Sequence, residues 1–284
     1  MKIAVTAASG RLGGAIIQYL VDSIGPEQIV GLARTPEKAQ HLGVEIRKGD
    51  YNRREDFEEG LKDVETVLIV SSMAEPEQRI QQHRNVIEAA KANGVRKIVY
   101  TSIIGEPGQT AFSPVIKSNR QTEEDVKASG LEWAIGRNGL YIEPDLEYID
   151  EYVEEGAIRN CAGEGLCAYT SRTELACAYA QMVLGNEHHG QTYNLVGEPI
   201  SQQQLAEYIN EVYGTQLTYE PIGVDEFIHD RQHALGAFLG TIIGGIYEGI
   251  RNGVFNPPSG FEQAAGRPHL SALELIRTFK QEAS

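Results

Sequence analysis

Positively charged residues are scarce in this sequence of 284 residues. It holds 25 lysines and arginines against 40 aspartates and glutamates, which gives a formal net charge of −15. No cluster of lysine and arginine is present that would follow the phosphates of a polymer. Because nucleic acids and anionic membrane surfaces attract basic surfaces, we expect neither as a partner.

Cysteines and long apolar runs are scarce as well. Cys161, Cys167 and Cys177 form no C-x-x-C pair and lie near no histidine at zinc-finger spacing, so we expect neither disulfides nor a metal site. The longest uncharged run, 234–247, is interrupted by glycines and is shorter than the roughly 20 residues of a membrane helix. Strand-forming residues begin at Lys2, so we expect no signal peptide and a soluble, cytoplasmic protein.

The first half of the chain alternates strand and helix patterns. Short β-branched runs at 3–5, 29–33, 67–70 and 97–100, with a further candidate at 44–48, predict strands buried on both faces. Between them lie helical segments, such as "QHRNVIEAAKANGV", in which Gly94 provides the stop. This order predicts an α/β fold with a Rossmann-like, doubly wound parallel sheet.

The pattern loosens after residue 139. Helices are expected at 173–184 and 201–213, single strands near Tyr193 and Leu217, and a last amphipathic helix in the tail. We expect residues 140–284 to form a smaller C-terminal α/β lobe that packs on the sheet domain 1–139 and is not an independent domain. It would cover the carboxyl edge of the sheet, where ligands of such folds bind.

The stretch "TAASGRLGG" follows the first expected strand and opens the first expected helix. Its spacing is G-x-x-G-x-x-G, with Ala7, Gly10 and Gly13 in the three glycine positions. The second position brings backbone N–H groups to a pyrophosphate and the third lets the helix pack on the strand, whereas the first only makes a turn, which alanine tolerates if its φ is negative. The context favours a dinucleotide site over a small-residue turn without ligand, and the loop residues that would line it are Thr6, Ala7, Ser9, Gly10, Arg11, Leu12 and Gly13.

The end of the second expected strand indicates which dinucleotide binds. An acidic residue there would hold the ribose hydroxyls of NAD, but the sequence places Arg34 at this point and Lys38 a turn later. Arginine suits the 2′-phosphate of NADP(H), and Arg11 is a candidate for a second contact with it. The alternative for both arginines is an ordinary solvated charge. Residues 1–139 are therefore expected to form an NADP(H)-binding domain.

Several stretches together resemble the NmrA-like group of atypical short-chain dehydrogenases/reductases, and within it the bacterial NADPH:quinone reductases. They are "TAASGRLG", "IVGLARTPEKAQ", "LIVSS", "QHRNVIEAAKANGV", "YTS", "ASGLEWAIGRNGLY" and "GRPHLSALELI", which extend over nearly the whole chain. The resemblance implies that NADPH lies along the glycine loop and Arg34. It also implies contacts from two further segments, with the residues Ser71, Ser72, Met73, Arg137, Asn138, Gly139 and Tyr141.

The sequence lacks the Tyr-x-x-x-Lys pair of the wider superfamily. None of the 13 tyrosines has lysine four residues later. Lys117 is the nearest lysine to the place where related atypical members keep one, and Ser113 precedes it by four residues; we interpret Lys117 as solvated. Oxidising an alcohol or epimerising a sugar needs a tuned base, but reducing a quinone by direct hydride transfer does not.

The function predicted is therefore an NADPH-dependent quinone reductase, with a small quinone-like substrate. Asn138 and Tyr141 are the candidates for lining the reaction pocket, although Asn138 also fits a plain turn residue. A non-catalytic NADP(H)-binding redox sensor of the NmrA-like type is the alternative. A sugar-nucleotide epimerase is disfavoured by the missing Tyr-x-x-x-Lys pair, and a homodimer is left open.

Overall fold

A computed structural model describes residues 2–108 and 110–282, and a seven-stranded parallel sheet is its largest element. The strand order is β3-β2-β1-β4-β5-β6-β10, and every pair is parallel. The order reverses between β1 and β4, which confirms the expected Rossmann-like, doubly wound sheet. The strands are β1 (Lys2–Val5), β2 (Ile29–Ala33), β3 (Glu45–Lys48), β4 (Val64–Ile69), β5 (Lys97–Ile103), β6 (Glu132–Asn138) and β10 (Gln191–Leu195).

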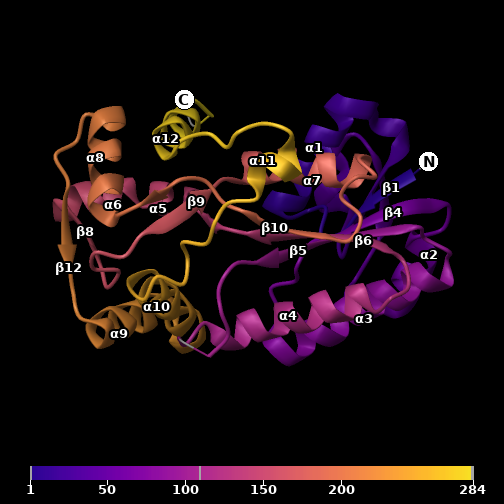
Figure 1. The fold of residues 1–284 in the computed structure, drawn as a ribbon, viewed down its shortest axis with the longest axis horizontal. Helices are drawn as coiled ribbons and strands as arrows, with labels where there is room; N and C mark the ends of the chain where they lie inside the picture. Colours follow the sequence, from indigo (N-terminus) through magenta and orange to yellow (C-terminus); the bar gives the residue numbers. More distant parts are fainter. Residues whose placement is uncertain (1, 109, 283–284) are drawn as a thin grey trace.

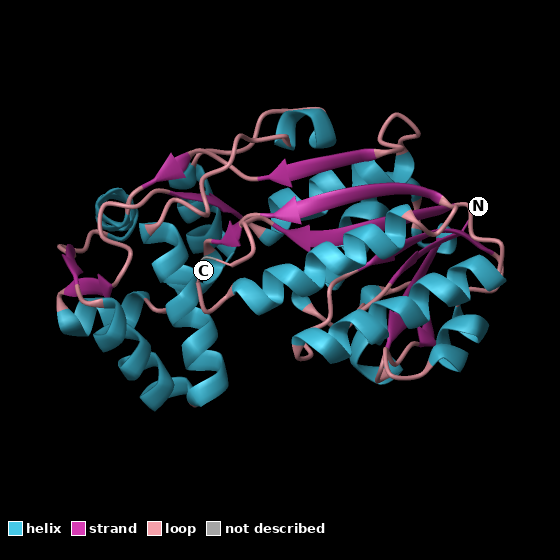
Figure 2. Ribbon diagram, turned by 60° about the horizontal axis from the view of Figure 1, so that its bottom comes forward, coloured by secondary structure: helices cyan, strands magenta, loops and turns pink. Residues whose placement is uncertain are grey.

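Helices cover both faces of this sheet (Figures 1 and 2). One face carries α1 (Arg11–Ile24), α7 (Arg172–Leu184) and α11 (Phe261–Ala265), and the other carries α2 (Arg54–Gly60), α3 (Pro76–Ala92) and α4 (Ser113–Lys127). Alternate residues of β1 divide between the two cores, since Ile3 and Val5 pack with α1 and α7, whereas Ala4 packs with α2 and α3. This division explains why the strand is apolar at successive positions. Two short 3₁₀ segments, η1 (Pro26–Gln28) and η2 (Pro36–Leu42), flank β2.

A smaller lobe lies beside the carboxyl edge of the sheet and has its own core (Figure 1). It contains a three-stranded sheet, β11-β9-β7, and a parallel pair, β12-β8. Its strands are β7 (Leu140–Tyr141), β8 (Ala157–Asn160), β9 (Cys167–Thr170), β11 (Pro199–Ile200) and β12 (Thr218–Pro221). Its helices are α5 (Glu143–Glu147), α6 (Ile149–Glu155), α8 (Gln202–Tyr213), α9 (Val224–Leu235), α10 (Ala237–Arg251) and α12 (Ala272–Glu282).

The two parts are interleaved along the chain. β10 follows the first five elements of the smaller lobe, yet it pairs with β6 at the edge of the large sheet, from Gln191 opposite Ala134 to Leu195 opposite Asn138. α7 and α11 also return to the large sheet and pack on the α1 face. The boundary between residues 139 and 140 therefore remains a proposal. It marks the end of β6, but α7, β10 and α11 from the second half of the chain also belong to the part built on the large sheet.

Most expected elements form close to where the pattern places them. The helix expected at 173–184 begins at Arg172, and its N-cap Ser171 accepts a hydrogen bond from the backbone of Glu174. Leu217, expected in a strand, lies just before β12. Across the described residues no helix combines the length and apolar character needed to cross a bilayer. The three cysteines are buried and carry free thiols.

Candidate cofactor and substrate site

The glycine loop joins β1 to α1 at the carboxyl edge of the sheet. The N–H of Gly10 donates to the carbonyl of Ala7 at 2.8 Å, and the N–H of Ala8 donates to Leu32 of β2 at 3.0 Å, so the loop is fixed to the strands behind it. Gly10 is the N-cap of α1 and supplies no side chain to cap the first turn, and Ser9 to Arg11 are exposed. The first N–H groups of α1 are therefore available to an anion, which fits the pyrophosphate of a dinucleotide.

Ala7 has a φ of +50°, in the left-handed region. The sequence interpretation made alanine acceptable on condition that φ is negative, and the structure shows that this condition is not met. The turn keeps the shape that glycine would adopt freely, and alanine adopts it under strain.

Gly13 fills the helix-packing role predicted for it. A Cβ at this position would lie 2.4 Å from the carbonyl oxygen of Ala7, which is far inside contact distance. At Gly10 a Cβ would lie 3.1 Å from the same oxygen, a tight but less severe approach. Leu12, between them, is buried in the core under α1. The close approach of α1 to the loop thus depends on Gly13.

The two candidate phosphate-binding arginines take different positions. Arg34 is exposed directly after β2, and within the described residues the structure records no hydrogen bond or ion pair of its side chain. Arg11 instead forms an ion pair with Glu147 of α5, reaching from the glycine loop to the smaller lobe. Only Arg34 is therefore free to meet a 2′-phosphate without losing a partner.

Thr6 and the segment after β4 lie beside the loop. The buried Thr6 hydroxyl accepts hydrogen bonds from the Tyr51 hydroxyl at 2.6 Å and from the Val70 N–H at 2.9 Å, so it ties β1 to β4. The Ser71 hydroxyl lies 2.5 Å from the carbonyl of Thr101 and points into the protein, whereas Met73 is 89% exposed. The Ser71 hydroxyl is therefore already bonded within the protein, and the Met73 side chain lies in solvent.

Ser72 has the features of a ligand-binding residue. Its hydroxyl oxygen is buried and has no hydrogen-bond partner in the structure. Its N–H donates to Nε2 of His83 at 3.0 Å, and Nδ1 of that ring lies 3.0 Å from the Thr122 hydroxyl. Burial, and secondarily the charge of Arg79, lowers the pKa of His83 to about 3, so the ring is neutral and its Nε2 accepts. Sequence reasoning missed His83, although it lies on the buried face of α3 with Val86 and Ile87.

The end of β6 directs two neighbouring residues to opposite faces, as a strand must. Arg137 points toward α4, where its guanidinium binds both carboxylate oxygens of Glu123 at 2.9 and 2.7 Å. Asn138 points the other way: its Nδ2 donates to the Tyr141 hydroxyl at 3.1 Å, and its Oδ1 lies 2.5 Å from the Tyr179 hydroxyl. Asn138 and Tyr141 thus contact each other, and Arg137 is held apart from them.

Gly139 connects these residues for reasons of packing. Its N–H donates to Leu195 at 3.0 Å, and a Cβ would lie 2.9 Å from the carbonyl oxygen of Ala168. Lys117 is exposed on α4. The family resemblance implied several cofactor-binding residues. Some of them, such as Ser72, have a polar group without a hydrogen-bond partner at the edge of the sheet, whereas others, such as Arg137, have side chains that already have partners.

A charged cluster borders Tyr141 that sequence reasoning did not find. The guanidinium carbon of Arg172 lies 5.5 Å from the centre of the Tyr141 ring, and the backbone N–H of Arg172 donates to Glu143 at 2.7 Å. Burial raises the pKa of Glu143 and raises that of Tyr141 to about 12. Tyr141 therefore keeps its proton at neutral pH. Its oxygen accepts from Asn138, which leaves the O–H proton available to donate.

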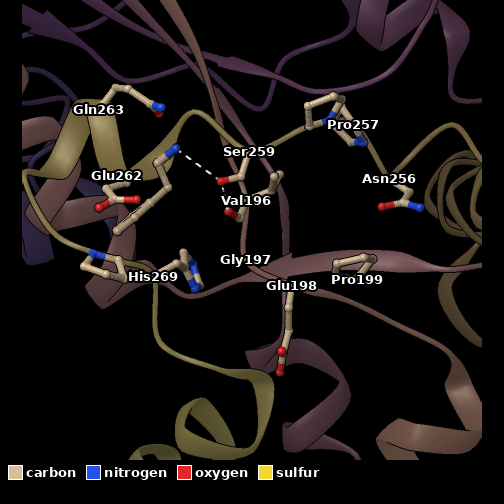
Figure 3. A pocket seen from close by; sticks show the side chains of 13 residues that line it. Val196, Gly197, Glu198, Pro199, Asn256, Pro257, Ser259, Glu262, Gln263 and His269 are labelled. Atoms are coloured by element: carbon tan, nitrogen blue, oxygen red, sulfur yellow. Dashed lines mark hydrogen bonds between the residues drawn. The ribbon is translucent and has the colours of Figure 1, made fainter.

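A cavity of about 410 Å³ opens beside Tyr141, between α5 and α6 on one side and α9 and α10 on the other. Its walls are mainly aromatic and aliphatic, which suits a planar apolar ligand. A different hollow of about 590 Å³ lies between the segment after β10 and the loop leading to α11 (Figure 3). Its lining mixes prolines and other apolar residues with polar side chains such as Glu198, Asn256 and His269, and it includes none of the predicted site residues. The cavity beside Tyr141 is therefore the candidate substrate site.

Comparisons with known proteins show the family of the chain. A family model described as NAD(P)H-binding matches residues 7–155. The chain is 35% identical to quinone oxidoreductase 2 of Escherichia coli over 229 residues, covering 79% of each protein. It is 31% identical to the NmrA-like family domain-containing oxidoreductase flvB of Aspergillus flavus over 236 residues, covering 80% of this chain and 76% of that one.

Two solved structures with bound cofactor share the whole fold. The NADPH complex of the E. coli NADPH-dependent quinone oxidoreductase has a TM-score of 0.89 at 31% identity, over 98% of this chain and 99% of the other. The NADP(H) complex of triphenylmethane reductase from Citrobacter sp. has a TM-score of 0.89 at 31% identity, over 99% of both chains. With a family model matched over half of its length and two relatives above 30% identity over more than three quarters of theirs, the chain belongs to the NAD(P)H-binding, NmrA-like family of reductases.

Proposed function

We propose that the protein is an NADPH-dependent quinone reductase that works by direct hydride transfer. The observation that carries this proposal is the aromatic cavity lined by Tyr141, whose hydroxyl accepts a hydrogen bond from Asn138 at the end of β6. The absence of a Tyr-x-x-x-Lys pair from the sequence points the same way, because this chemistry needs no base. The similarity to E. coli quinone oxidoreductase 2 supports the quinone as substrate class.

The residues of this chain would hold the cofactor at the edge of the sheet. The free N–H groups at the start of α1 suit its pyrophosphate, the exposed Arg34 suits a 2′-phosphate, and the unpartnered Ser72 hydroxyl suits a sugar hydroxyl. NADPH supplies the hydride when bound. Homologues solved with NADPH or NADP(H) support this form of the cofactor over NADH.

Tyr141 is the proposed hydrogen-bond donor to the substrate. Its hydroxyl keeps its proton, since burial raises its pKa to about 12, and Asn138 fixes its oxygen by donating to it. The O–H can then donate to one oxygen of the quinone as negative charge develops there. Water, not a side chain, completes the protonation of the product. The protein thereby contributes orientation and exclusion of water.

The test is consumption of NADPH with a panel of small quinones. We expect turnover by the natural protein and, for Tyr141→Phe, a loss of about tenfold in kcat/KM, the value of one hydrogen bond to a charged oxygen. Tyr148→Phe is the matched control, because Tyr148 lines the same cavity but is 39% exposed. A protein that binds NADPH and NADP⁺ tightly but turns over no quinone would instead be a redox sensor.

A further inference from the structure

The substrate cavity contains two arginines with very different surroundings. Arg159, at the end of β8, faces Glu220 at 3.6 Å and Glu226 at 3.9 Å. Arg231 of α9 has no hydrogen bond or ion pair recorded with any of the described residues, and its Nε is buried without a partner. Its guanidinium carbon lies 5.5 Å from the centre of the Phe227 ring. Arg231 is therefore an unneutralised positive charge in an aromatic cavity.

The acidic residues of the cavity do not neutralise it. Asp145 is buried and accepts hydrogen bonds from the Tyr247 hydroxyl and, at 3.4 Å, from the Tyr152 hydroxyl. Burial raises the pKa of Asp145. Glu151 and Glu155 also line the cavity, but they are exposed on α6, where water screens them.

Arg231 is half-buried, and its buried Nε–H carries a cost unless an acceptor pairs with it. Withdrawing a donor from water without a partner carries a free-energy penalty, and this penalty is recovered when an oxygen of the ligand accepts from it. The gain is largest for an anionic oxygen, because charge-assisted hydrogen bonds are about twice as strong as neutral ones. The aromatic walls select a planar ring to carry that oxygen.

We propose that Arg231 is a specificity residue that binds a ring oxygen of the aromatic ligand, the oxygen that becomes a phenolate when the ring is reduced. This inference rests on the proposed function and adds the charge class of the ligand. It predicts that the cavity prefers phenolates and quinones over cationic aromatic molecules, which Arg231 repels. Triphenylmethane dyes are cationic, so the substrate class named for the Citrobacter relative is disfavoured here.

The preference is measurable without cofactor or turnover. A nitrophenol is titrated with the protein, and the visible absorbance of its phenolate form reports both binding and ionisation. We expect the natural protein to bind the phenolate and to lower the pKa of the bound phenol. Arg231→Gln should weaken phenolate binding by about tenfold or more, the value of one charge-assisted hydrogen bond. It should also strengthen the binding of a cationic triarylmethane dye.

Arg159→Gln is the matched control. It removes the same charge from the same cavity, but the guanidinium it removes already faces two glutamates, so phenolate binding should stay within about twofold of the natural protein. Arg231→Lys keeps the charge and should retain most of the phenolate binding, whereas Arg231→Met, which removes the charge but keeps an apolar stem, serves as the test if Arg231→Gln fails to fold. Equal losses for Arg159→Gln and Arg231→Gln, or no loss on Arg231→Gln (or on Arg231→Met in its place) beyond that of the control, would overturn the proposal.

Quinone turnover is measured in parallel so that the two proposals can fail separately. Phenolate binding that depends on Arg231 without any quinone reduction would reject the reductase function and leave the binding site standing. Quinone reduction with phenolate binding unchanged in Arg231→Gln would reject the role of Arg231 and leave the reductase standing.

Discussion

Ala7 occupies a backbone conformation that favours glycine, with a φ of +50°. An alanine in the left-handed conformation costs about 1–2 kcal/mol. Glycine would relieve this strain, but it would also stabilise the unfolded chain by about 0.4–1 kcal/mol, because glycine has more conformational entropy there. We therefore expect Ala7→Gly to raise the free energy of unfolding by about 1 kcal/mol. NADPH affinity should change by less than about tenfold, because Gly10 and Gly13 keep their roles.

Urea denaturation and NADPH titration of both proteins test this expectation. A less stable Ala7→Gly protein would show that the alanine methyl makes a contact worth more than the strain. A natural protein that binds no dinucleotide while Ala7→Gly binds tightly would show that alanine has disabled the loop.

Arg34 should determine which dinucleotide the protein prefers. Its exposed guanidinium stands at the tip of β2 with no recorded partner among the described residues, and a charge-assisted bond to phosphate is worth about 1.5–3 kcal/mol. Arg34→Ala should weaken NADPH binding by about ten- to a hundredfold and leave NADH binding nearly unchanged. The loss of NADPH affinity should be smaller at high salt, because salt screens the contact in the natural protein. Arg11→Ala should have a smaller effect, since Arg11 is paired with Glu147. Equal losses for both cofactors on Arg34→Ala would show that the arginine supports the loop and reads no phosphate.

His83 should make stability depend on pH. Burial lowers its pKa to about 3 in the folded protein, whereas an unfolded histidine titrates near about 6.5. Between these values the unfolded chain binds a proton that the folded protein does not, so the free energy of unfolding falls as the pH is lowered. One proton corresponds to about 1.4 kcal/mol per pH unit.

The His83→Gln variant isolates this contribution. Its oxygen can still accept from the N–H of Ser72, and it does not titrate. Between about pH 6 and 5, its free energy of unfolding should fall less steeply than that of the natural protein, by about 1.4 kcal/mol per unit. The other buried histidines contribute equally to the pH dependence of stability in both proteins, so the difference between the two profiles reports His83 alone. Parallel pH profiles would show that His83 is charged when folded.

At the scale of elements, the glycine loop and α1 form a unit whose packing depends on Gly13. A methyl group there would meet the Ala7 carbonyl at 2.4 Å, so Gly13→Ala must push α1 off the strand. We expect a loss of about 2 kcal/mol in the free energy of unfolding and loss of NADPH binding. Gly14→Ala is the control, because its Cβ would make only ordinary contacts at 3.6 and 3.7 Å and alanine favours helix. Similar behaviour of the two variants would contradict the packing role.

The sequence predicted the bounds of an element well where all of its residues share the same degree of burial. β2 is buried at every position and matches its apolar run. β4 starts three residues before the expected 67, because it includes Glu65, which pairs with Arg96, and the buried Thr66. β12 is polar and mostly exposed, so its sequence carries little strand pattern. Which side Arg137 and Asn138 face depends on the register of β6, and the pattern alone does not fix it.

At the scale of the whole molecule, the parallel sheet and the position of the site at its carboxyl edge follow from the order of elements. The place of β10 in the sheet does not follow from it, because several elements of the other lobe lie between β6 and β10 in the sequence. The substrate cavity was equally beyond sequence reasoning. It is built from α5, α6, α9 and α10, which lie up to about a hundred residues apart and meet through packing alone.

This interleaving predicts that the chain folds as one cooperative unit. The core between the sheet and α1 combines Ile16 and Leu20 of the first half with Tyr179 and Met182 of α7. The buried amine of Lys97 donates to the carbonyl of Met182 at 2.6 Å. A fragment of residues 1–139 would expose that apolar face and leave the edge of β6 unpaired.

We therefore expect the full chain to unfold in a single transition by near- and far-ultraviolet circular dichroism, and the fragment 1–139 to show no cooperative transition of its own. The fragment 1–200, which adds β10 and α7, is the matched comparison. It should regain part of the cooperative signal, because it restores the α7 face and the pairing of β10 with β6. A fragment 1–139 that unfolds cooperatively would show that the first half is an autonomous domain that folds without α7 and β10.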